Sequence, residues 1–113
     1  MSVKRQGRRV AEMDDLMLPG DYTLGYNSDG QIVSMWFSMP GFPSHRWNRI
    51  NGPAAEREPR WEITEDAEGV VHVEPSIRTQ WTEGQEPRCF HGFLHHGVWE
   101  VLDDSIGAEL SGT

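Results

Sequence analysis

The chain has 113 residues, of which 36% are hydrophobic, so it is long enough for one compact domain and too short for two. It contains one cysteine, which excludes an intrachain disulfide framework and favours a reducing compartment. The sequence has neither a run of about 18 apolar residues nor an apolar signal-peptide core, so we expect a soluble protein that is not exported and does not contact membranes.

Charge divides the chain into two unequal parts. The first nine residues carry four basic side chains and no acidic one: Lys4, Arg5, Arg8 and Arg9. The remainder holds six arginines and all 18 acidic residues, a net charge of −12. Such a body repels phosphate backbones, so we expect nucleic-acid binding only through the basic N-terminal arm. The arm could instead contact anionic lipid or an acidic neighbouring subunit, or be a solvated tail.

The first half of the chain predicts an arm, a hairpin and a loop, in that order. Residues 1–20 have weak helical periodicity and end at a Pro-Gly turn signal, so we predict a flexible arm with one or two helical turns. Residues 22–26 and 31–39 are rich in aromatic and β-branched side chains and flank an Asp-Gly turn, which predicts a hairpin. Residues 44–59 are polar and predict a long loop, with a short helix near residues 54–57 as an option.

The second half predicts two more hairpins. Residues 60–64 and 70–77 form the first, and Pro75 marks an edge, a bulge or the end of its second strand. A Gly/Glu/Pro-rich loop at residues 82–87 then leads to strands at residues 89–94 and 98–102, joined by the tip His95-His96-Gly97.

Six strands in three hairpins predict an all-β domain over residues 21–113, built mainly of antiparallel hairpins as a small sandwich-like or barrel-like meander. Alternation along the strands also predicts which side chains form its core. The expected set is Trp61, Ile63, Val71, Val73, Ile77, Phe93, Val98 or Trp99, and Val101, from which some members must fail because only one face points inward. Trp36 is also read as core.

The segment from Arg88 to Leu102 concentrates the residue types that bind metals. The single cysteine and three of the five histidines lie within eight residues. Alternation places Cys89, His91 and His95 on one face if the strand is unbulged, so these three, with distant His45 or His72, are the candidate metal ligands. The opposing interpretation is that His95 and His96 are an ordinary polar hairpin tip.

The run Trp61, Pro75-Ser76-Ile77, His91-Gly92-Phe93-Leu94 and Gly97-Val98-Trp99 resembles a domain-of-unknown-function family of short phage and prophage proteins, some labelled "ammonia monooxygenase". The resemblance covers about residues 35–112. It implies a small β protein with a bound zinc, held by an early Cys-Pro-x-Cys pair, a Cys-His-x-Phe hairpin and a late Cys-x-His.

This chain departs from that pattern at most of the implied ligand positions. The early pair falls on Met39 and Phe42, and the late pair near Ser105 and Gly107. A closed zinc site requires four ligands, so we expect no cofactor and infer that zinc has been lost, with packing by Met39 and Phe42 in its place.

Ser76, His91 and Asp103 or Asp104 can be assembled on paper into a nucleophilic triad. Their spacing does not require it, and a serine that follows proline at a strand end commonly satisfies its own backbone. The sequence therefore predicts no catalytic residue. Whether the chain is an enzyme stays undecided, and the residues favour a protein without enzymatic activity.

Aromatic residues in the two breaker-rich loops predict a protein-binding surface. Phe42, Arg46 and Trp47 lie in one loop and Trp81 beside the other, with charged neighbours that can form a polar rim. The alternative for Trp47 is a lid folded over the end of the sheet.

These observations lead to the hypothesis of a phage or prophage protein that acts by protein–protein contact. It would be a virion head or tail accessory component or an inhibitor of a host defence complex, located in the host cytoplasm or the virion, and homo-oligomers are an option. The alternative is a small metal-dependent enzyme or metal-binding module that uses Cys89, His91 and His95.

Overall fold

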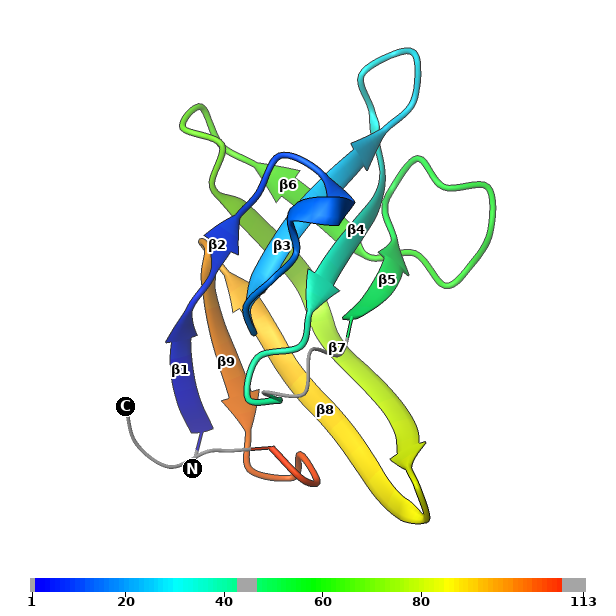
Figure 1. Ribbon diagram of the computed structural model, residues 1–113. Coiled ribbons are helices and arrows are strands. Elements are labelled where there is room, and N and C mark those ends of the chain that lie inside the picture. The colour runs from blue at the N-terminus through cyan, green and yellow to red at the C-terminus, as the bar shows by residue number, and fades with distance from the viewer. Residues whose placement is uncertain (1, 43–46, 109–113) are drawn as a thin grey trace.

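The protein is an all-β fold of two sheets, seen in a computed structural model that describes residues 2–42 and 47–108 (Figure 1). The larger sheet has five strands in the order β1-β9-β8-β7-β6, and the smaller has four in the order β2-β3-β4-β5. All neighbouring strands are antiparallel except β2 and β3. The predicted fold class is therefore confirmed.

The larger sheet contains two of the three predicted hairpins. Strands β6 (Glu62–Glu65) and β7 (Val71–Glu83) form one, and β8 (Glu86–His95) and β9 (Val98–Leu102) form the other. Strand β7 continues to Glu83 and β8 begins at Glu86, so a long β7–β8 hairpin replaces the loop expected at residues 82–87. This hairpin extends well beyond the rest of the sheet (Figure 1).

The smaller sheet contains the remaining hairpin and one strand that the sequence did not predict. Strands β3 (Asp21–Tyr26) and β4 (Ile32–Ser38) turn at residues 27–30, where Gly30 has φ 77° and the Asn27 side-chain oxygen accepts the backbone N–H groups of Asp29 and Gln31. Strand β5 (Trp47–Asn51) pairs with β4 inside the segment expected to be a loop. The helix considered near residues 54–57 is wrong, because those residues form turns and bends.

Residues 2–9 belong to the two sheets, although we expected residues 1–20 to be a flexible arm. Strand β1 (Ser2–Gln6), which carries Lys4 and Arg5, pairs along β9, and β2 (Arg8–Arg9) pairs with β3. A 3₁₀ turn, η1 (Met13–Asp15), follows. Ion pairs bind both remaining basic side chains to the body, Arg8 to Asp21 and Arg9 to Glu65. The negative charge of the body therefore attracts the basic segment into the fold.

The core lies between the sheets and centres on Trp99, whose ring is fully buried and packs at a tilt against Phe37 and edge-to-face against Phe90. Its Nε1 donates to the carbonyl oxygen of Gly20 at 2.9 Å, which satisfies the one polar atom that its burial removes from water. The predicted core members that are buried are Ile63, Val71, Val73, Ile77, Trp99 and Val101, whereas Trp36, Trp61, Phe93 and Val98 keep partial exposure.

Candidate active site

The outer face of the β7–β8 pair carries the residues that are able to act in catalysis or to bind a metal. Phe90, Gly92 and Leu94 of β8 point inward and are buried, so the alternating positions His91, Phe93 and His95 point outward. On β7 the pairing register jumps between Val73 and Ile77, so three β7 residues there oppose only one on β8. Ser76 is the last of these three residues, and bulges commonly re-aim a side chain next to an active site.

Ser76, His91 and Asp104 form a hydrogen-bonded chain. The Ser76 Oγ lies 3.2 Å from His91 Nε2, and His91 Nδ1 lies 2.9 Å from both carboxylate oxygens of Asp104. An ionised carboxylate can only accept hydrogen bonds, so it places the proton of a neutral His91 on Nδ1. Nε2 then presents its lone pair to the Ser76 hydroxyl. This is the arrangement in which an imidazole can remove the proton of a serine nucleophile.

Asp104 is held in place by the segment that follows β9. The Ser105 Oγ accepts the backbone N–H of His91 at 3.0 Å and donates to its carbonyl oxygen at 3.1 Å. One residue later, Ile106 exchanges two backbone hydrogen bonds with Cys89. The turn therefore lies along β8 on both sides of His91, and its backbone brings the Asp104 carboxylate to the imidazole.

Two further contacts fix the strands that carry Ser76 and His91. The indole Nε1 of Trp61 donates to the Ser76 carbonyl oxygen at 3.1 Å, which fixes the backbone at the bulge. Gly92 follows His91 at a place where a Cβ would collide with the Glu100 carbonyl oxygen and the Phe90 ring. A glycine is therefore required beside the imidazole for β8 to pack closely on β9.

The site is open on one side to solvent. The side chains of His91 and Asp104 are 21% and 50% exposed, so a substrate could approach the serine from the outer face. Arg78 is exposed, pairs in register with His91, and follows Ser76 by two residues on the same strand. Positive charge therefore lies beside the serine in an otherwise acidic protein.

The structure separates the predicted metal ligands. Cys89 is 1% exposed and its backbone pairs with Ile106, and His91 is engaged by Asp104 and Ser76. His95 lies instead with His72 and Glu74, and among the described residues this trio is the group whose ligand atoms come within metal-binding range. His45 lies outside the described residues. Met39 and Phe42, where the resemblance placed ligands, are buried in the core.

The four residues predicted to bind a partner occupy different environments. Phe42 is 2% exposed and packs edge-on against Trp81 at 4.9 Å between ring centroids, so it fills the core rather than an exposed surface. Trp81 is partly buried by that contact. Trp47 is 54% exposed, with one face covered by Trp36. Arg46 lies outside the described residues, and partner binding by this set stays a prediction.

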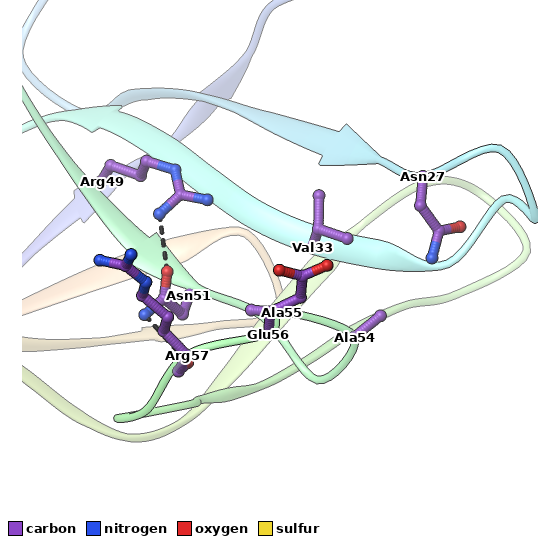
Figure 2. A pocket seen from close by; sticks show the side chains of 8 residues that line it. All are labelled: Asn27, Val33, Arg49, Asn51, Ala54, Ala55, Glu56 and Arg57. Carbon is purple, nitrogen blue, oxygen red and sulfur yellow. Dashed lines mark hydrogen bonds between the residues drawn. The ribbon is translucent and has the colours of Figure 1, made fainter.

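A hollow of about 400 Å³ lies elsewhere, at the end of the β3–β4 hairpin beside β5 (Figure 2). Its lining consists of Asn27, Val33, Arg49, Asn51, Ala54, Ala55, Glu56 and Arg57. Figure 2 shows Arg49 directed to the Asn51 side chain, with which it makes a hydrogen bond of 2.6 Å. None of these lining side chains is a serine, cysteine or histidine, so the hollow offers no nucleophile of the kind found on β7 and β8.

The sequence offered Ser76, His91 and Asp103 or Asp104 as a possible triad, but the sequence analysis predicted no catalytic residue. Ser76 and His91 approach because of the bulge, and Asp104 rather than Asp103 reaches the ring because the turn pairs with β8. The signals present in the sequence were the Pro-Ser pair within a strand and the His-Gly pair that permits close packing.

Residues 10–102 match the model of one protein family, described as "Bacterial ubiquitination-like system serine protease (BubE)". The match overturns the phage hypothesis, because the family is described as bacterial. It supports neither a virion component nor a phage inhibitor of host defence. It also does not support the resemblance to phage zinc-binding proteins. The family description points to an enzyme, contrary to the preference drawn from the residues. No curated protein and no solved structure matches. The chain belongs to the BubE family of bacterial ubiquitination-like system serine proteases.

Proposed function

We propose that this chain is a serine peptidase in which Ser76 is the nucleophile, His91 the general base and acid, and Asp104 the residue that orients His91. The observation that carries the proposal is the continuous chain of contacts from Ser76 Oγ through the imidazole to the Asp104 carboxylate. The family match is an independent support, because its description names a serine protease.

The geometry assigns each residue a step in acyl transfer. His91 Nε2 takes the hydroxyl proton as Ser76 Oγ attacks the carbonyl carbon of the substrate, and Asp104 stabilises the imidazolium that forms. His91 returns the proton to the leaving group as the scissile bond breaks, which leaves an ester on Ser76. Water then attacks that ester with His91 again as base, and the acid product departs.

The order of the triad along the chain, Ser76, His91, Asp104, differs from the orders of chymotrypsin-like enzymes, subtilisin and α/β-hydrolases. Such triads are recognised by geometry and role rather than by sequence position. A small two-sheet fold can therefore form a catalytic triad from residues on a β-bulge, a neighbouring strand and a turn.

The substrate is proposed to be a protein of the bacterial ubiquitination-like system that the family description names. The open outer face supports a macromolecular substrate, because Ser76 lies on an extended hairpin rather than in an enclosed cavity (Figure 1). We further propose that the protein works in the bacterial cytoplasm. Among the described residues there is no helix both long and apolar enough to span a membrane.

A fluorophosphonate probe tests the proposal directly, because it reacts with activated serine hydroxyls. We expect one adduct per chain, mapped by peptide mass spectrometry to Ser76 and lost in Ser76→Ala and His91→Gln. Ser28→Ala, which removes an exposed turn serine, should be labelled like the wild type. Labelling that persists in folded Ser76→Ala would refute the assignment.

A further inference from the structure

A second histidine cluster lies on the outer face of the larger sheet, next to the triad but separate from it. His72 and Glu74 project from β7 and His95 from the end of β8. His72 Nε2 lies 3.0 Å and His95 Nε2 3.1 Å from the same Glu74 oxygen, Oε1. One potential ligand atom from each residue lies within 4.8 Å of the other two.

The cluster does not satisfy its own polar atoms. His95 Nε2 and His72 Nδ1 are buried and lack hydrogen-bond partners among the described residues, and the contact of His95 with Glu74 lacks the direction of a hydrogen bond. The two rings stack at 4.7 Å between centroids with an angle of 17° between their planes. Buried polar atoms without partners cost free energy, and a ligand bound by His95 Nε2 would remove that cost at this atom.

The donor types indicate which ligand would do so. Two imidazole nitrogens and one carboxylate oxygen suit a divalent transition metal, with Zn²⁺ as the usual case, whereas Mg²⁺ and Ca²⁺ prefer oxygen donors alone. A tetrahedral zinc with bonds of about 2.0–2.1 Å separates its ligand atoms by about 3.3 Å. The two separations between a histidine nitrogen and the Glu74 oxygen, 3.0 and 3.1 Å, are close to that value, and all three ligand atoms lie within 4.8 Å of one another.

We propose that His72, Glu74 and His95 form a binding site for one Zn²⁺ ion, with water in the fourth position. The site would join the start of β7, including Glu74 in the bulge, to the end of β8. It is not the four-ligand site implied by the resemblance, because it uses none of the positions Met39, Phe42, Cys89 and Ser105. It is also independent of the triad, because Ser76, His91 and Asp104 supply none of its ligands.

Zinc titration of the tag-free full chain, followed by calorimetry, tests the site, and Co²⁺ absorption in the visible range reports its coordination. We expect one zinc per chain, a tetrahedral Co²⁺ spectrum, and no binding of Mg²⁺. Glu74→Gln and His95→Ala should each weaken zinc binding by at least about tenfold, because a direct ligand is lost.

Two matched variants show where the ion binds. His96→Asn removes a histidine that contacts His72 but is not a proposed ligand, and asparagine tolerates the positive φ of 51° at that position. His91→Gln removes the histidine of the triad. Both should bind zinc with wild-type affinity. Absence of stoichiometric binding, equal affinity in all folded variants, or loss of binding in His91→Gln would each overturn the proposal.

Discussion

The imidazole of His91 and the carboxylate of Asp104 meet although they are 13 positions apart in the sequence, and Nδ1 lies 2.9 Å from each carboxylate oxygen. The end of β8, the hairpin tip, strand β9 and the start of the following turn occupy the intervening residues. Because the carboxylate fixes the proton on Nδ1, this single contact decides whether Nε2 can act as a base towards Ser76.

Asp104→Asn should therefore abolish most catalysis without unfolding the protein. An asparagine can donate to Nδ1 and so favour the imidazole tautomer whose Nε2 carries a proton and cannot accept the serine proton. We expect kcat to fall about 10³–10⁴-fold with little change in Tm. Asp103→Asn, at the adjacent acidic residue, is the control and should retain near wild-type kcat. Similar losses in both variants would show that the negative charge of the turn, rather than the Asp104–His91 contact, is responsible.

Arg78 predicts a charge preference for the substrate. It lies beside His91 across the strands and is exposed, so its guanidinium can bind an acidic side chain or a terminal carboxylate near the scissile bond. We expect Arg78→Ala to raise KM for acidic peptides about five- to tenfold, which corresponds to about 1 kcal/mol, and to leave kcat nearly unchanged.

The comparison of acidic and neutral peptides distinguishes this role from a general loss of fold. KM for neutral peptides should not change in Arg78→Ala, and Arg57→Ala, which alters the separate hollow in Figure 2, should affect neither class. Equal KM values for acidic and neutral peptides in the wild type would contradict the prediction.

Much of the fold was predictable from local sequence, and the site was not. The residues of the turn at 27–30 and of the His96-Gly97 tip predict their hairpins from local sequence alone, because both turns use residues that tolerate positive φ. Strand β5 has a polar sequence and exists because β4 offers it an edge, so its pattern alone indicates a loop.

The triad depends on two features that spacing does not encode. The register jump between Val73 and Ile77 appears only when β7 pairs with β8, and the turn after β9 is attached to β8 by hydrogen bonds of Ser105 and Ile106. The sequence contained a serine, a histidine and two aspartates, and the tertiary structure places one of the two, Asp104, against the histidine. The same pairing moved His95 from Cys89 and His91 to His72 and Glu74.

Asp21 predicts how stability depends on acid. Its carboxylate is 1% exposed and accepts hydrogen bonds from Arg8 and from the backbone N–H groups of Met17 and Leu18. Burial alone would raise the pKa of Asp21, but these hydrogen bonds outweigh burial and hold the pKa below its ordinary value. The stabilisation is therefore complete above the unfolded pKa of about 3.9 and is lost as the pH falls through the lower folded pKa.

Chemical denaturation of wild type and Asp21→Asn across pH measures this contribution. At pH 7 the variant should be less stable by about 2–3 kcal/mol, because charge-assisted hydrogen bonds weaken and Arg8 loses its partner. The difference should shrink as the pH falls below about 4. A difference that stays constant down to the acid transition would mean that shape, rather than charge, makes Asp21 important.

Trp47 remains the best candidate for contact with a protein partner, which is here proposed to be the substrate protein. It is 54% exposed on β5, the edge strand of the smaller sheet. The next residue, Asn48, points inward and donates a hydrogen bond of 2.6 Å to Thr79 of β7, whereas Trp47 points to the opposite face of β5 and contacts Trp36. A folded substrate that places its scissile bond at Ser76 reaches the indole only if it extends around the edge strand β5 to the smaller sheet.

We expect Trp47→Ala to raise KM for the protein substrate about 30-fold, equivalent to about 2 kcal/mol at an interface hot spot. KM for a short peptide should be unchanged, because a peptide that occupies only the triad does not reach β5. The Tm should change little, whereas Trp99→Ala, which empties the core, should lower stability by about 3–5 kcal/mol. If Trp47→Ala instead unfolds the protein or raises KM for both substrates equally, then the indole is a lid over the end of the sheet and not a docking residue.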